Sequence, residues 1–138
     1  MDMMMTDMMK AMPKMPDMAA KAMGMDMTMM QSCIEACSAA AQAATMCADA
    51  DAMEGMAKCA AMCANTADVA TAMMHMMMRP SGYDSAVMMP MMEACMAMGT
   101  ACSAECMMHA DMADHCRICA MACDAMVESC RSMMAAMA

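Results

Sequence analysis

Cysteine recurs at helical spacing in this chain, most densely in the segment CRICAMACDAMVESC at residues 116–130. Cys116, Cys119, Cys123 and Cys130 share this segment, and Met126 lies between the last two of them. Residues three or four positions apart lie on the same face of an α-helix, so these sulfurs point in one direction. A face of this kind can be a reactive row, a disulfide framework, a row of metal ligands or part of a hydrophobic core.

The Cys-x-x-x-Cys spacing, which points two sulfurs the same way, occurs as Cys33/Cys37, Cys59/Cys63, Cys102/Cys106 and Cys119/Cys123. Disulfides within one helix are disfavoured, because Cβ atoms at this spacing are about 5–6 Å apart and a disulfide needs about 3.8 Å. Bonds between helices remain open, as does a plain core of small cysteines and adaptable methionines. An ion held between paired sulfurs accounts for the repeated spacing best.

The ligand types favour a soft monovalent metal. Thiolate and thioether select Cu(I), and Ag(I) is chemically similar. Zinc takes thiolate and imidazole, iron–sulfur clusters use short loop motifs that are absent here, and calcium and magnesium need oxygen ligands. We therefore expect the protein to bind multiple Cu(I) ions.

The remaining sequence predicts the helices that position these sulfurs. We expect an all-α fold, an antiparallel up-and-down four-helix bundle with a Met-rich N-terminal extension. The extension is residues 1–16 and the Cys/Met-lined bundle is residues 17–138. We expect four long helices at about residues 17–51, 53–78, 85–109 and 112–137. The turn RPSGYD separates the second helix from the third, and Asp84 or Ser85 can be the N-cap of the third. The first of these helices is weakened near Gly24.

At 100° per residue, all the cysteines fall on one inward stripe per helix. The predicted metal ligands are Cys33, Cys37, Cys47, Cys59, Cys63, Cys95, Cys102, Cys106, Cys116, Cys119, Cys123 and Cys130, with Met126 and His109 in support. The third stripe also includes Met88 and Met91. Asp51 ends the first stripe, where we expect it to be a cap or exposed rather than a ligand.

Composition narrows the function further. The 138 residues include 37 Met and 12 Cys, and Leu, Phe and Trp are absent, so Met, Ala and Cys must form a core that Met specifies weakly. A net charge of −9 argues against nucleic acid and anionic membranes. No apolar run reaches the roughly 18 residues of a membrane helix, and no signal peptide is evident. We therefore expect a cytoplasmic protein, although an exported form is not excluded.

Several segments resemble one family, the bacterial copper storage proteins. They are CIEACSAAAQAATMCADA, KCAAMCANTADVA, RPSGYD, EACMAMGTACSAECMMHA and HCRICAMACDAM, within about residues 30–132. The resemblance implies a Cys-rich four-helix bundle that stores many Cu(I) ions, with His or Met near its open end. The chain departs from the family at Ala40, Ala44, Asp51, Ala70, Gly99 and Met126, where relatives often carry Cys. The Met content is consistent with an unusual natural lineage or with deliberate redesign of the core.

Other functions remain as alternatives. A metal-free structural or redesigned Met-core bundle and a general soft-metal buffer for Zn or Ag both fit the composition. A thiol oxidoreductase would use CRIC at residues 116–119, but no βαβ pattern accompanies it, so we expect no enzyme activity. The expected partners are copper ions together with a copper chaperone or efflux system, and assembly into a homo-oligomer is left open.

Overall fold

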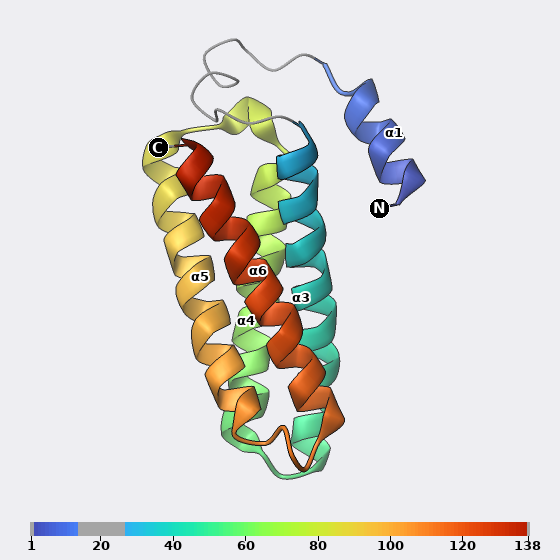
Figure 1. Ribbon diagram of the computed structural model, residues 1–138, viewed down its shortest axis with the longest axis vertical. Helices are drawn as coiled ribbons and strands as arrows, with labels where there is room; N and C mark the ends of the chain where they lie inside the picture. The colour runs from blue at the N-terminus through green and yellow to red at the C-terminus, as the bar shows by residue number, and fades with distance from the viewer. Residues whose placement is uncertain (1, 14–26, 138) are drawn as a thin grey trace.

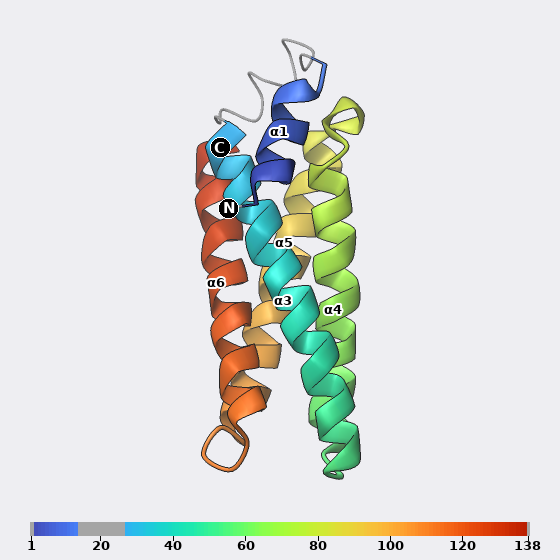
Figure 2. The ribbon, with the colours of Figure 1, turned by 90° about the vertical axis from the view of Figure 1, so that its right-hand side faces the viewer.

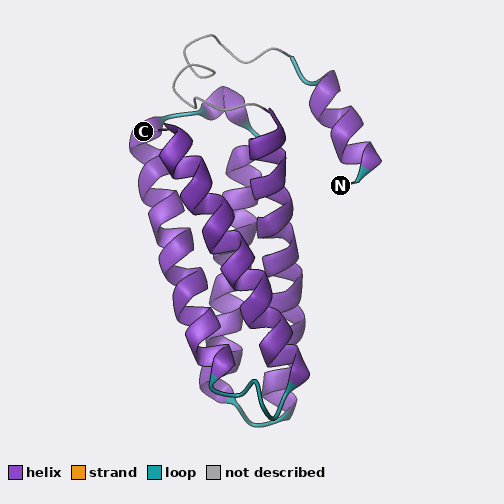
Figure 3. Cartoon of the chain, in the orientation of Figure 1, coloured by secondary structure: helices purple, strands orange, loops and turns teal. Residues whose placement is uncertain are grey.

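The computed structural model describes residues 2–13 and 27–137, and within them it contains helices and turns but no strand (Figure 3). The helices are α1 (Met3–Ala11), α3 (Met27–Met53), α4 (Ala57–Met77), the short 3₁₀ helix η1 (Pro80–Gly82), α5 (Ser85–Met107) and α6 (Asp114–Met137). The all-helical prediction is confirmed. The expected start of the first long helix at residue 17, and the weak point at Gly24, lie outside the described residues.

The four long helices lie side by side, and each reverses the direction of the one before it (Figures 1 and 2). α3 and α5 each contact both α4 and α6. One end of the bundle carries η1 and the end of α6, while the other carries the links at residues 54–56 and 108–113 (Figure 1). Short links make sequential helices neighbours, so the inward stripes of all four face a common axis.

Local capping explains where the helices begin and end. Asp84 starts α5 by accepting a hydrogen bond from the backbone N–H of Ala86 at 2.9 Å, as predicted for one of its two candidate caps. Gly55 follows α3 with a φ of 76°, a left-handed conformation that glycine adopts without steric cost. Pro90 lies inside α5, near its start.

The described N-terminal helix α1 lies beside the start of α3 (Figures 1 and 2). Asp2 caps it by accepting from the backbone N–H of Met4 at 2.8 Å. Gln31, which is 5% exposed, donates from Nε2 to Thr6 Oγ1 at 3.1 Å, and Met9 packs against the bundle core. One polar and one apolar contact therefore tie α1 to the bundle.

The core consists largely of Cys, Met and Ala, as the composition requires. The predicted stripes are buried with one shift of register: Met92 is fully buried on α5, whereas the predicted Met91 is only partly buried. Met91 and Met92 precede Cys95 by four and three residues, so both flank the inward face, and packing buries Met92 more completely. Among the described residues, no helix is both long and apolar enough to cross a bilayer.

Candidate metal centre

All twelve cysteines are free and buried, none more than 1% exposed. They come from all four long helices, so the prediction that every Cys faces inward is confirmed. Twelve buried thiols without a disulfide among them leave the sulfurs available as ligands. Packing in the core divides the thiols into two groups.

The larger group lies toward the end with the links at 54–56 and 108–113, and we call it the Asp-side thiol group. Its members are Cys47, Cys59, Cys63, Cys102, Cys106, Cys116, Cys119 and Cys123. Cys63 is central to it, with its Sγ 3.6 Å from Cys106 Sγ, 3.8 Å from Cys102 Sγ and 3.9 Å from Cys119 Sγ. Sγ atoms of Cys47, Cys63, Cys106 and Cys119 all lie within 4.8 Å of one another. One soft ion can therefore be shared among sulfurs from all four helices.

Asp51 is at the edge of this group and is 0% exposed. Its carboxyl oxygens accept from Cys116 Sγ at 3.4 Å and from Cys47 Sγ at 3.6 Å. Of the two roles expected for Asp51, a cap or an exposed residue, exposure is wrong, because the last turn of α3 packs against the beginning of α6. Its carboxyl oxygens offer an acceptor to both thiols inside the core.

His115 completes the same end of the core. Its Nδ1 lies 3.2 Å from Cys47 Sγ, 3.6 Å from Cys116 Sγ and 3.7 Å from Asp51 Oδ1. Its other nitrogen, Nε2, lies 2.8 Å from Glu54 Oε1. A carboxylate can only accept, so Glu54 favours a proton on Nε2, and in the neutral imidazole the Nδ1 lone pair then faces the thiols, the arrangement usual for a metal-binding histidine.

The smaller group, which we call the Met-side thiol group, contains Cys33, Cys37, Cys95 and Cys130. Cys33 Sγ lies 3.9 Å from Cys130 Sγ, and the ligand atoms of Cys33, Cys37 and Cys130 lie within 4.8 Å of one another. Cys95 donates to the thioether sulfur of Met126 at 3.7 Å. Met126 is fully buried, so the structure places this predicted residue beside the thiols.

A layer without thiols separates the two groups. It consists of buried residues without a thiol: Ala40 and Ala44 on α3, Thr66 and Ala70 after the two cysteines of α4, Gly99 on α5 and Met126 on α6. A Cβ on Gly99 would lie 2.8 Å from Val127 Cγ2 and 3.0 Å from Met126 Cε, so Met126 fills the space beside this glycine. Among the described residues, no hydrogen bond joins a thiol of one group to a thiol of the other.

Hydrogen bonds between thiols, together with burial, raise the pKa of most thiols and keep them protonated in the absence of metal. Burial, together with the Asp51 carboxyl, raises the pKa of Cys116 to about 11. The hydrogen bond with Cys130 raises the pKa of Cys95 to about 12. Hydrogen bonds from Cys33, Cys37 and Cys95 instead hold the pKa of Cys130 below its ordinary value. Neutral thiols avoid the large cost of burying many negative charges along one axis.

These shifts predict that the metal-free protein loses stability in alkali. A thiol whose pKa is raised on folding contributes stability that is complete below pH 9.0 and is lost as the pH rises through about 11 for Cys116. We expect the melting temperature of the reduced apoprotein, followed anaerobically by circular dichroism, to fall across this range. Cys116→Ser should make the fall shallower, and a melting temperature that stays constant above pH 9.0 would contradict the shift.

Two histidines, His109 and His115, lie near this end of the bundle, and they differ in their distance from the thiols. The predicted ligand His109 is partly buried in the turn after α5, and among the described residues it joins no cluster of potential metal ligands. His115, which was not among the predicted ligands, lies in a cluster with Cys47, Asp51 and Cys116. The available signal was its position immediately before Cys116, but its partners come from α3 and are not apparent in the sequence.

The sequence matches the family described as Csp, copper storage protein, over residues 17–135. The chain belongs to the copper storage protein family. The match covers the described bundle up to residue 135, so both thiol groups lie within the family region. No curated protein matches the chain.

Solved structures agree with this membership. A histidine-to-alanine variant of Ccsp from Streptomyces lividans is 39% identical, with a TM-score of 0.78, over 83% of this chain and 99% of that one. A cytosolic copper storage protein from S. lividans carrying five coppers is 38% identical, with a TM-score of 0.74, over 78% and 93%. Ccsp from S. lividans loaded with 10 copper equivalents is 38% identical, with a TM-score of 0.75, over 80% and 86%.

Proposed function

We propose that this protein stores multiple Cu(I) ions through the cysteine thiolates that line its bundle. The observation that carries the proposal is the convergence of twelve free, buried thiols from four helices on one axis. The thiols lie close enough to share ions, and thiolates are preferred ligands of Cu(I). The function is stoichiometric binding, and we propose no catalytic reaction for the chain.

Loading exchanges protons for metal. Each thiol that binds transfers its proton to solvent as its sulfur bonds to Cu(I), so affinity falls as the pH falls. The raised pKa of thiols such as Cys116 means that most of these protons are still present near neutrality. The buried axis keeps the bound ions away from water and dissolved oxidants.

The proposed ligands are the twelve cysteines, supported by the Met126 thioether and by imidazole. The predicted role of His109 stays a proposal without a contact in its favour, while the geometry supports His115 Nδ1 and the Asp51 carboxyl at the same end. Met126 would serve the Met-side thiol group through its contact with Cys95.

An anaerobic Cu(I) titration of the fully reduced protein against a chromophoric Cu(I) chelator tests the proposal. We expect uptake of many equivalents, with loss of thiol reactivity in parallel. Uptake of about one equivalent or none would contradict storage and favour the metal-free structural bundle. His109→Ala and His115→Ala compare the two imidazoles, and we expect only the second to weaken the tightest binding.

A soft-metal buffer that also accepts zinc is the second candidate function. The cluster of Cys47, Asp51, His115 and Cys116 combines thiolate, carboxylate and imidazole within 4.8 Å, and zinc accepts these ligand types in a tetrahedral site. Competition of Zn(II) against Cu(I) in the same titration distinguishes the two candidates. Displacement of zinc by stoichiometric Cu(I) would leave copper as the stored metal, and the reverse would favour the buffer.

The proposal also includes the arrangement of the helices, the cellular location and the partners of the protein. We propose an antiparallel up-and-down four-helix bundle at residues 17–138 with a Met-rich extension at residues 1–16. Free thiols are typical of a reducing compartment, and the S. lividans relative is described as cytosolic, which supports a cytoplasmic location. Exchange of copper with a chaperone or efflux system, and association of copies of the chain, are part of the same proposal.

A further inference from the structure

Methionine divides into two populations in the described part of the chain. One is buried in the core, where Met73, Met92, Met126 and Met133 are 0% exposed. The other lies on the surface and is at least 44% exposed; its members are Met3, Met4, Met8, Met12, Met46, Met53, Met107, Met108, Met112 and Met121. We call these ten residues the outer methionines. Methionine is usually buried in proteins, so packing does not account for their positions.

The outer methionines are spread over the molecule rather than gathered at one site. Four lie in α1 or at its C-cap and form the N-terminal set: Met3, Met4, Met8 and Met12. Four lie at or beside the links at the end of the bundle that carries Asp51 and form the link set: Met53, Met107, Met108 and Met112. The other two, Met46 and Met121, lie on the outer sides of α3 and α6.

The thiols are distributed in the opposite way. No cysteine is more than 1% exposed. The thiol is also the less reactive form, since oxidants attack the thiolate, and burial raises the pKa of Cys116 to about 11. The sulfur that an oxidant in solution meets first is therefore thioether sulfur.

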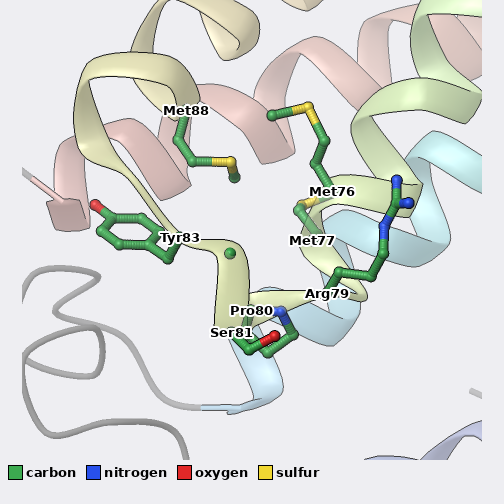
Figure 4. Close-up of a pocket in the computed structure, with 8 residues that line it drawn as sticks. Met76, Met77, Arg79, Pro80, Ser81, Tyr83 and Met88 are labelled. Atoms are coloured by element: carbon green, nitrogen blue, oxygen red, sulfur yellow. The ribbon is translucent and has the colours of Figure 1, made fainter.

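The methionines at the RPSGYD turn show that outward thioethers belong to particular positions. Met76, Met77 and Met88 line a pocket of about 370 Å³ between the end of α4 and the start of α5 (Figure 4). Met77 is 1% exposed and Met88 is 4% exposed, so both belong with the buried population. Within one chain, these buried residues serve as internal standards for the outer methionines.

We propose that the outer methionines are a sacrificial sink for fast two-electron oxidants, represented by hypochlorous acid, and that they spare the thiols of the core. Each thioether sulfur loses two electrons and becomes a sulfoxide. Overall, one sulfur–oxygen bond forms, the oxygen–chlorine bond breaks, and hypochlorous acid is reduced to chloride with release of one proton. The benefit of the sink rests on the proposed storage function, because an oxidised cysteine no longer offers a thiolate to Cu(I).

Surface positions suit a sink because oxidation there leaves the fold intact. A sulfoxide is polar and disrupts a core, whereas at an exposed position such as Met112, 82% exposed, it is solvated. Exposed sulfoxides are also accessible to enzymes that reduce them, so the sink can be regenerated, while the sulfinic and sulfonic acids of cysteine are largely irreversible. The net charge of −9 repels anionic oxidants but not neutral hypochlorous acid.

The test titrates the full-length, reduced, metal-free protein with hypochlorous acid. Remaining thiols are counted after each quenched addition, and peptide mass spectrometry locates the sulfoxides. We expect no loss of thiols until about ten equivalents have been consumed, one for each outer methionine. Met77 and Met88 should stay unoxidised over this range. Loss of thiols from the first addition, in parallel with sulfoxide formation, would overturn the proposal.

Substitutions by glutamine test whether this delay belongs to the outer methionines. Glutamine resembles methionine in length and helix propensity and is inert to the oxidant. Replacing the four methionines of either set should bring the onset of thiol loss forward by about four equivalents. The link-set variant is Met53→Gln, Met107→Gln, Met108→Gln and Met112→Gln, and the N-terminal-set variant is Met3→Gln, Met4→Gln, Met8→Gln and Met12→Gln.

The matched control replaces exposed side chains that carry no sulfur. It is Val87→Gln with Ile118→Gln, at positions 53% and 52% exposed, and its onset of thiol loss should equal that of the unaltered protein. An unchanged onset in both methionine variants would overturn the sink. Melting curves check that every variant folds, and the sulfoxide map of the unaltered protein decides the question if one does not.

Copper uptake after the challenge distinguishes failure of the sink from failure of storage. After about eight equivalents of oxidant, the unaltered protein should keep its full Cu(I) capacity, and a variant lacking both sets should have lost part of its own. Equal retention in the two proteins would contradict the sink and leave storage standing. If neither protein binds copper before the challenge, storage fails, and the thiol counts of the metal-free protein still decide the sink.

Discussion

Loading with Cu(I) should raise the melting temperature of this protein by more than 10 °C. A ligand that binds only the folded state stabilises it by about 4 kcal/mol at a free concentration 1,000 times its dissociation constant. For a chain of this size, 1 kcal/mol corresponds to about 3–4 °C. One tightly held ion is therefore sufficient, and the two thiol groups provide sites for more.

The apoprotein is expected to gain this much because its core is weakly specified. Met73, Met77, Met92 and Met133 are fully buried, and flexible methionines fill space without fixing one arrangement. Ions bonded to sulfurs on different helices would fix the helices relative to one another.

Anaerobic differential scanning calorimetry of the reduced protein, before and after loading, measures this difference. The control is the loaded sample after removal of copper by a strong Cu(I) chelator, which should return to the melting temperature of the apoprotein. Equal melting temperatures for apoprotein and loaded protein, with copper demonstrably bound, would show that the ions do not bridge the helices.

Cys119→Ser should remove more copper capacity than the loss of one thiol alone predicts. Cys119 belongs to two potential metal clusters, one with Cys47, Cys63 and Cys106 and one with Cys102 and Cys123. A serine hydroxyl is a hard donor that does not replace a thiolate for Cu(I). We therefore expect the Asp-side thiol group to lose at least one shared ion and to bind the others less tightly.

The matched control is Ala120→Ser, which introduces a hydroxyl at the neighbouring position, 1% exposed, and keeps every thiol. Both variants are titrated with Cu(I) against the same chelator. In parallel, the NMR signal of the ¹³C-labelled Met126 methyl group, which lies beside Cys95, reports loading of the Met-side thiol group. That group should load normally in both variants. A capacity of Cys119→Ser equal to that of Ala120→Ser would contradict the shared-ion arrangement.

Helical periodicity was sufficient to predict which side chains turn inward. The intervals of three and four residues fix the direction of each side chain around its helix, and Cys33, Cys63, Cys102 and Cys123 are all buried as expected. The turn at RPSGYD was equally readable, because Pro80 and Gly82 interrupt helix formation and Asp84 caps α5. The soft ligand set and the family resemblance then indicated copper without a structure.

Only the tertiary structure decided which sulfurs meet and what else joins them. Periodicity gives the direction of a side chain, but the height at which helices pack depends on links such as Gly55 and on contacts across the core. That packing buries Asp51 and brings His115 to Cys47, whereas His109 lies beyond the end of α5, where the helical phase no longer applies. The division into two thiol groups follows from the same cause, since it depends on which residues of different helices lie at one height.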